Sequence, residues 1–179
     1  MYRRLAQNGM LLAFVVSVIT GCQTVTVNDY ADYEPPLTLA EFFSGDLRAE
    51  GVVKNFRGKV IRTFTADINA YWNTGIGTLE EDFLFNDGEK QRRVWTLTPD
   101  AHGGYTGTAA DVIGAGKVTV AGNSAFLNYV LRVPYGDGTI DLRIDDRMYL
   151  TSTGLLINES TMRKFGFKVG EIVLTIFRV

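Results

Sequence analysis

Residues 77–98 hold the side chains best suited to chemistry, because acidic, basic and aromatic residues alternate there around Asp87-Gly88. Asp-Gly is typical of a two-residue β-turn, which requires positive φ at both positions. Pairing about this turn places Asp82 opposite Arg93 and Phe83 opposite Arg92, and either face of the hairpin then carries charge toward the interior. The candidate ligand-binding residues in this hairpin are Glu81, Asp82, Phe83, Arg92, Arg93 and Trp95.

Two interpretations of this hairpin remain open. In the first, it lines a cavity in which the planar guanidinium of Arg92 or Arg93 holds the anionic end of a ligand, such as a carboxylate or phosphate. In the second, the charges form ion pairs across the strands and fix their register, which is the simpler interpretation. An inward charge must be paired in either case, because burying it alone is costly.

Asp146 is the other candidate ligand-binding residue. It shares one face of an expected strand over 139–150 with apolar residues that include Ile144 and Met148. A carboxylate in such a series is expected to be buried and hydrogen-bonded. An ion pair with an Arg of the hairpin is the simpler expectation, and a ligand-contacting or catalytic carboxyl with a raised pKa is the alternative.

Most enzyme classes are disfavoured by composition. His102 and Cys22 are the only His and Cys in the chain, so a His-based triad or a His-rich metal site is hard to build. The sequence has no phosphate-binding loop, dinucleotide fingerprint or nucleophile elbow. Acidic residues at 80–82 and 145–146 have Arg residues among them and lack the spacing of a metal-binding loop. We therefore expect no catalytic residue, no metal and no cofactor.

Strands must position the candidate residues, because apolar and polar side chains alternate along much of the chain. The pattern is clearest over 60–72, where Phe64, Ala66 and Ile68 share a face. Other strands are expected near 50–56, 104–112, 116–121, 124–133, 139–150, 154–163 and 171–178.

Residues 135–138 (Tyr-Gly-Asp-Gly) predict a second hairpin turn. It would place Leu131 opposite Leu142, Val133 opposite Ile140, and Arg132 opposite Asp141, so apolar and charged pairs agree on one register.

A short helix should precede the strands. Thr38 and Glu41 have the spacing of a capping box, and one or two helical turns would end at Gly45. A short N-terminal helix and about ten strands predict an all-β fold, an antiparallel lipocalin-like (calycin) barrel of about 8–10 strands. Such a barrel can hold one small ligand. An open β-sandwich is the alternative.

The first residues are typical of a bacterial lipoprotein leader. Arg3 and Arg4 precede an apolar run, which ends at Ile19-Thr20-Gly21-Cys22, a lipobox pattern. We expect 1–21 to be a signal peptide, 22–36 a lipidated N-terminus and tether, and 37–179 one barrel domain. Because Gln23 rather than Asp follows Cys22, outer-membrane sorting is expected, with the domain facing the periplasm.

The net charge disfavours a nucleic-acid partner. The chain carries 18 Lys and Arg against 20 Asp and Glu, and removing 1–21 takes away two Arg, leaving about −4. Nucleic-acid binding needs a basic face. The negative net charge also disfavours electrostatic binding of anionic lipid through a polybasic segment. Membrane contact is therefore expected through the lipid anchor, while the protein partners are open.

Five segments resemble the proteobacterial lipoprotein family of unknown function numbered 3833. They are 39–45 (LAEFFSG), 77–89 (GTLEEDFLFNDGE), 91–95 (QRRVW), 145–150 (DDRMYL) and 164–170 (KFGFKVG). The resemblance implies a shared fold. Genes of that family often lie near genes for fatty-acid modification, which favours a lipid-related role, although fold alone does not imply function.

Three functions remain open from the sequence. The leading one is a lipid-anchored barrel that binds or shuttles a small amphipathic ligand, such as a fatty acid or lipid. The second is a structural or interaction lipoprotein with a filled core. The third is a small lipid-modifying enzyme with Asp146 or Glu81 as a general acid or base.

Overall fold

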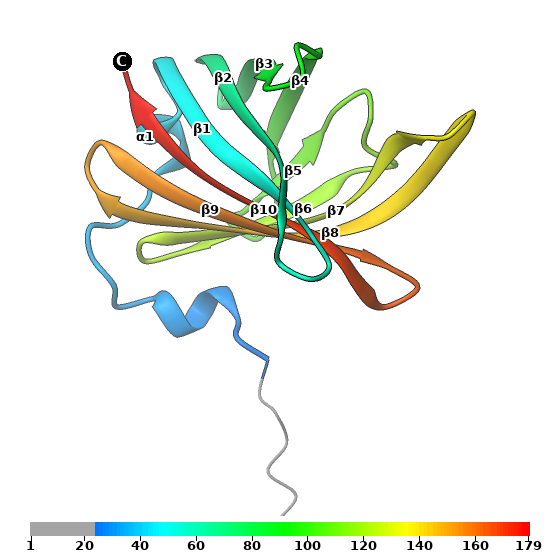
Figure 1. The fold of residues 1–179 in the computed structure, drawn as a ribbon. Helices are drawn as coiled ribbons and strands as arrows, with labels where there is room; N and C mark the ends of the chain where they lie inside the picture. The colour runs from blue at the N-terminus through cyan, green and yellow to red at the C-terminus, as the bar shows by residue number, and fades with distance from the viewer. Residues whose placement is uncertain (1–23) are drawn as a thin grey trace, which may run out of the picture.

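Ten antiparallel strands follow one another around a closed sheet in the computed structural model, which describes residues 24–179 (Figure 1). Two short helices precede them, η1 (Val27–Tyr30) and α1 (Leu39–Phe42). The strands are β1 (Gly45–Asn55), β2 (Val60–Asn73), β3 (Ile76–Phe85), β4 (Lys90–Pro99), β5 (Tyr105–Thr108), β6 (Gly116–Ala121), β7 (Ser124–Tyr135), β8 (Gly138–Ser152), β9 (Leu155–Lys164) and β10 (Phe167–Arg178).

The barrel closes where the last strand pairs with the first. Each strand pairs with the next along the chain, and β10 returns to β1, with Ala49 opposite Ile176. This up-and-down connectivity leaves no open sheet edge. The expected lipocalin-like antiparallel barrel is confirmed, and the alternative of an open sandwich is wrong.

Alternation along the strands builds the core. In β2, Phe64, Ala66, Ile68 and Ala70 are each at most 6% exposed, while the residues between them face outward. Each large apolar side chain buried in this way contributes about 1.5–3 kcal/mol. The face predicted for segment 60–72 is therefore the inner face of the barrel.

The β7–β8 hairpin has the register that its sequence predicts. Leu131 lies opposite Leu142, Val133 opposite Ile140, and Arg132 opposite Asp141. The Arg132 Nε donates to Asp141 Oδ1 at 2.8 Å on the outer surface.

The β3–β4 hairpin differs from its prediction by one residue. The Phe85 N–H donates to the Glu89 carbonyl and the Gly88 N–H to the Phe85 carbonyl, each at 2.9 Å, and Gly88 has φ +88°. Three residues rather than two thus form the turn. The predicted register was wrong, because Glu81 pairs with Arg93 and Asp82 with Arg92. A shift of one residue exchanges the faces of one strand relative to its partner.

The N-terminal segment packs on the barrel rather than extending freely. Val27 is buried, and the Tyr30 ring lies 5.9 Å from Phe126 and 5.3 Å from Tyr149. The Leu37 N–H donates to the carbonyl of Gly122, in the β6–β7 turn, at 2.8 Å. The described part of the expected tether therefore docks on β6 and β7.

The predicted short helix is confirmed as α1, but its predicted cap is not. The Thr38 side chain makes no capping hydrogen bond. Tertiary contacts hold α1 instead, because Phe42 and Phe43 are buried and Trp72 Nε1 donates to the Phe43 carbonyl at 2.7 Å. Packing thus fixes the helix more than local capping does.

The two ends of the barrel differ in cover. Up-and-down strands place the β1–β2, β3–β4, β7–β8 and β9–β10 turns at one end, called here the hairpin end. The other end, called the covered end, holds the β6–β7 turn and α1, whose Leu39 and Phe42 join the core. Residues 1–21 and Cys22 lie outside the described residues. Within 24–179 no helix is long and apolar enough to cross a bilayer.

Candidate ligand-binding cavity

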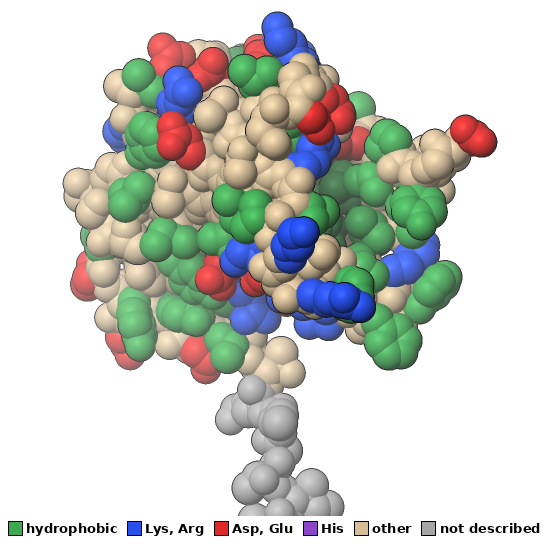
Figure 2. Space-filling view, in the orientation of Figure 1, with side chains coloured by type: hydrophobic (Ala, Val, Ile, Leu, Met, Phe, Trp, Pro, Cys, Tyr) green, Lys and Arg blue, Asp and Glu red, His purple; other side chains and the backbone are tan. Residues whose placement is uncertain are grey.

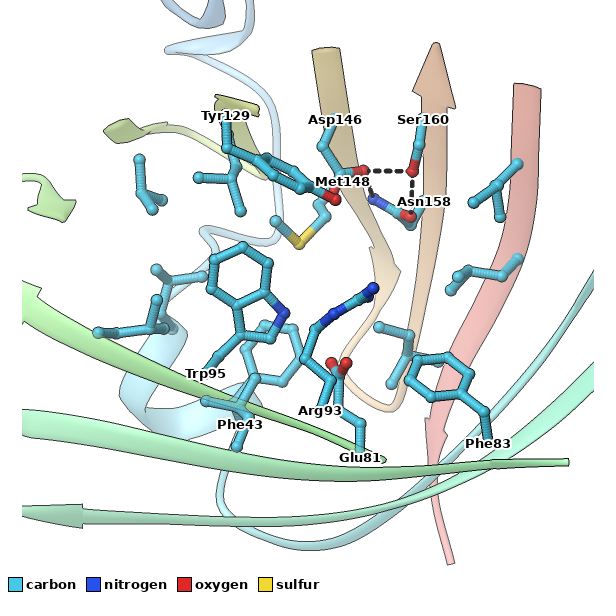
Figure 3. A pocket seen from close by; sticks show the side chains of 18 of the residues that line it. Phe43, Glu81, Phe83, Arg93, Trp95, Tyr129, Asp146, Met148, Asn158 and Ser160 are labelled. Atoms are coloured by element: carbon cyan, nitrogen blue, oxygen red, sulfur yellow. Dashed lines mark hydrogen bonds between the residues drawn. The ribbon is translucent and has the colours of Figure 1, made fainter. Parts of the chain in front are cut away.

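A cavity of about 130 Å³ lies inside the barrel (Figure 3). Its apolar lining consists of Leu39, Phe43, Phe64, Leu79, Phe83, Trp95, Leu97, Val118, Leu127, Met148, Ile172, Leu174 and Ile176. Its polar lining consists of Glu81, Arg93, Tyr129, Asp146, Asn158 and Ser160. An engineered apolar cavity of about 150 Å³ binds benzene, so this volume suits a small ring or one part of a longer molecule.

Glu81 brings a carboxyl group to the cavity from β3. Its strand neighbour on the inner face, Leu79, is buried, and Arg93 lies directly opposite on β4. Among residues 24–179, the structure shows no hydrogen bond or ion pair to the Glu81 carboxyl. Burial raises the pKa of Glu81 to about 7, the positive charge of Arg93 opposes this rise, and the charge of Asp146 adds to it.

Arg93 is held by Asp111, which lies in the connection between β5 and β6. Arg93 Nη2 and Nε donate to Asp111 Oδ2 at 2.7 and 3.0 Å. Burial disfavours the charge of Arg93, but the hydrogen bonds to Asp111 and the nearby Glu81 raise its pKa above the usual value. Arg93 is therefore a fixed cation, and in the described part of the chain its Nη1 makes no hydrogen bond. Figure 3 shows its side chain reaching into the cavity.

Asp146 is satisfied by neutral partners on β9. Ser160 Oγ donates to Asp146 Oδ1 at 2.7 Å, and Asn158 Nδ2 donates to the same oxygen (Figure 3). Burial raises the pKa of Asp146, and the two hydrogen bonds oppose that rise. The expected ion pair with an Arg of the hairpin was wrong, since the structure shows none within the described range. Arg93 instead pairs with Asp111.

Aromatic rings form the wall beside these groups. The Trp95 and Tyr129 rings meet edge to face with centroids 5.2 Å apart. Burial and the charge of Asp146 raise the pKa of Tyr129, so its hydroxyl is neutral and can donate or accept a hydrogen bond. Phe64 and Phe83, with centroids 5.7 Å apart, continue the wall.

The balance of charge around the cavity favours the acids. Three carboxyls, those of Glu81, Asp111 and Asp146, lie near the guanidinium of Arg93, and only Asp111 forms an ion pair with it. Because Glu81 titrates near neutrality, the charge of the cavity changes close to pH 7. A polar group that enters it would meet a cation, a proton donor and several acceptors.

The structure divides the candidate residues into two groups. Glu81, Phe83, Arg93, Trp95 and Asp146 line one cavity. Arg92 and Asp82 lie on the outer face, where Arg92 donates to Asp82 and Glu80 at 2.6 Å each. The sequence left open which face of this hairpin points inward. In the structure the candidates Arg92 and Asp82 lie outside the cavity, because the three-residue turn shifts the pairing by one residue and places Glu81 and Arg93 together on the inner face.

Three residues of the site were missed by reasoning from the sequence. Asn158 and Ser160 follow Leu156 at every second position on the inner face of β9. Two polar residues on the same face as an apolar one were the signal that the sequence offered. Asp111 lies between strands, and nothing in the local sequence marks it as a partner of Arg93. The expected absence of a metal remains a prediction, although residues 24–179 contain no cluster of metal-ligating side chains.

Comparison with known proteins identifies the family. The chain is similar to the S-type phycobiliprotein lyase CPES from Guillardia theta at 13% identity and a TM-score of 0.49, over 80% of this chain and 93% of that one. No curated protein matches the chain. A family model described as a protein of unknown function, DUF3833, matches residues 16–178. The chain therefore belongs to the DUF3833 family.

Proposed function

We propose that the barrel binds one small amphipathic ligand, a fatty acid or related lipid, with its polar end beside Glu81 and Arg93. The observation that carries this proposal is the Glu81 carboxyl, which faces a largely apolar cavity and has no hydrogen bond from residues 24–179, beside a guanidinium whose Nη1 likewise makes none within that range. A cavity with mostly apolar walls and a few convergent polar groups is the usual form of a small-ligand site.

Protonation of Glu81 would remove a negative charge that otherwise repels the anionic head group of a ligand. At pH 6 the carboxyl is largely neutral, because its pKa is about 7, and it could donate a hydrogen bond to a carboxylate held by Arg93. At pH 8 the ionised carboxyl would repel the same head. Binding of an anionic ligand is therefore coupled to uptake of one proton.

The size of the cavity sets how the rest of the ligand is placed. About 130 Å³ holds only a few carbon atoms beyond the head. A longer acyl chain would extend past Phe64 and Phe83, away from α1, or displace Met148, whose unbranched side chain repacks easily.

Native mass spectrometry of a chain beginning at Gln23 tests the proposal directly. This chain contains every described helix and strand, and its folding is checked by circular dichroism. We expect an added mass after purification, or after incubation with fatty acids, that is released on denaturation. A mass that stays that of the protein alone with fatty acids and with phospholipids would refute ligand binding.

Two neighbouring residues of β10 give a matched pair of variants. Ile172 lines the cavity, whereas Val173 faces outward. Ile172→Trp should fill the cavity and abolish the added mass, and Val173→Trp should retain it. Loss in both variants, or in neither, would place the bound molecule elsewhere.

The pH dependence distinguishes an anionic head from a neutral one. Between pH 6 and 8 the fraction of chains with protonated Glu81 falls about tenfold, so affinity for a fatty acid should fall about tenfold. Glu81→Gln should remove this dependence. A neutral lipid would bind equally well at both pH values.

We also propose that the protein is an outer-membrane lipoprotein, anchored through Cys22 and facing the periplasm. The lipobox pattern and the preceding apolar run support this proposal. Cys22→Ser should abolish incorporation of labelled palmitate and move the protein out of the outer-membrane fraction of a density gradient. Unchanged labelling and fractionation would contradict it.

A further inference from the structure

We propose that the tips of the β1–β2 and β9–β10 hairpins form a docking surface for an anionic lipid bilayer. We call residues 54–59 and 163–171 the tip surface. The proposal does not depend on the cavity or on a lipid anchor, and it can fail or hold separately from both.

Strand pairing places the two tips side by side. β1 and β10 remain paired to the hairpin end, where Lys54 lies opposite Glu171 and Asn55 opposite Gly170. Figure 1 shows both hairpins projecting from the lower part of the barrel, β1–β2 in cyan and β9–β10 in red-orange. The two tips therefore project from neighbouring strands at the same end of the barrel.

Three phenylalanines stand exposed on the tip surface. Phe56 is 63% exposed, Phe165 88% and Phe167 78%. Each of them lies at or beside a turn, where its ring can insert into a bilayer without a change in the barrel.

Phe165 is also strained in a way that the fold does not require. Its φ is +50° and that of Gly166 is +85°, so the two form a turn with positive φ at both positions. Asn-Gly is the usual sequence for such a turn, and a bulky aromatic residue rarely adopts positive φ. A strained, exposed aromatic residue at a tip points to a role outside the fold.

The charge of the tip surface is opposite to that of the whole chain. It carries six Lys and Arg against one acid, Glu171, although the chain has a net charge of −2. Glu171 lies 3.9 Å from Lys54 and 3.2 Å from Lys168, and Lys164 Nζ donates to the backbone carbonyl of Asp141 at 2.9 Å. Within residues 24–179 the other cations of the tip surface form no ion pair. Figure 2 shows basic and hydrophobic side chains gathered at the lower right, where these hairpins project. The net charge of the whole chain therefore does not reveal the positive charge of the tip surface.

Cations beside apolar rings fit a bilayer interface. Arg57 lies 5.1 Å from the Phe56 ring centre and Lys164 4.9 Å from that of Phe165. At a membrane surface the rings can enter the acyl boundary while the flexible basic side chains reach the phosphates. Anionic head groups attract such clusters of Lys and Arg.

Vesicle sedimentation tests the proposal with the chain beginning at Gln23. Vesicles contain phosphatidylcholine alone or with about one third phosphatidylglycerol, whose surface attracts cations. We expect binding only to the anionic vesicles and a steep loss of binding at high salt. Equal binding to both, or binding to neither, would overturn the proposal.

Phe165→Asn separates docking from stability. Asparagine suits the turn, so the urea midpoint should rise, while vesicle binding should fall about tenfold or more because one ring no longer inserts. Leu84→Ser, which removes an exposed apolar residue from the barrel wall, is the control and should leave binding unchanged. A stabilised Phe165→Asn variant with unchanged binding would overturn the proposal.

Charge variants complete the test. Lys164→Gln with Lys168→Gln should lower binding to the anionic vesicles about 25-fold, from roughly fivefold for each cation near the surface. Arg48→Gln, at the opposite end of β1, should change it less than twofold. Equal losses from both variants would indicate general electrostatics and would contradict a defined docking surface.

Discussion

Replacing Glu81 by Gln should reduce the pH dependence of stability above pH 4.5. In the folded protein, burial raises the pKa of Glu81 to about 7 from its ordinary value of about 4.5. The folded chain therefore binds this proton more tightly than the unfolded chain does, and the resulting stability is fully present below pH 4.5 and lost as pH rises through 7. A shift of about 2.5 pH units corresponds to about 3 kcal/mol.

Urea unfolding at pH 5, 6, 7 and 8 measures this effect. The free energy of unfolding of the parent should fall across the series, and that of Glu81→Gln should fall less. Asp146, whose pKa is also raised, contributes a slope of the same sign in both proteins. The difference between parent and variant therefore isolates Glu81, and it should change by about 2.5 kcal/mol between pH 5 and pH 8.

Glu80→Gln is the matched control. Glu80 is the neighbour of Glu81 on the outer face of β3, where Arg92 donates to it. This variant should keep the pH dependence of the parent. Parallel pH profiles for the parent and Glu81→Gln would refute the claim that burial in the cavity perturbs this carboxyl.

Three further variants test the structure by urea unfolding. Asp111→Asn should lower the free energy of unfolding by about 1–2 kcal/mol, because it weakens charge-assisted hydrogen bonds to the largely buried Arg93. An unchanged free energy of unfolding would mean that the ion pair does not stabilise the fold. Ser160→Ala should cost about 1–2 kcal/mol, and a neutral result would contradict its hydrogen bond to the buried Asp146 carboxyl. Gly51→Ala should cost about 1–3 kcal/mol, because its Cβ would lie 2.6 Å from the nearest side chain. Gly138→Ala is the control, because a Cβ at Gly138 would meet no atom within 4 Å, and it should change stability by less than about 0.5 kcal/mol. Equal effects of the two substitutions would contradict the clash at Gly51.

The fold was largely accessible from the sequence because its signals are local. The strand expected over 116–121 has those bounds in the structure, and the β7–β8 hairpin has its predicted register. In that hairpin, apolar and charged pairs support the same alignment, so any slip would lose both. In β3–β4 the charged residues on both faces can pair in either register, and the length of the turn decided.

The site was accessible only in part. Glu81, Arg93 and Asp146 were recognised as charges that must be explained if they are buried, and the structure places all three at one cavity. Their partners were not recognised. Asp111 reaches Arg93 from a connection 18 residues away along the chain, and no local pattern encodes that contact.

The sequence by itself determined the class of fold, the order of the strands and the inward position of Asp146, because side-chain alternation and turn residues act between neighbours. Only the tertiary structure decided that Glu81 and Arg93 face the same cavity, which depends on one residue of register, and that Asp111 rather than Asp146 pairs with Arg93. It also placed two hairpin tips, more than 100 residues apart in the chain, on one basic and aromatic surface, because barrel closure pairs the first strand with the last.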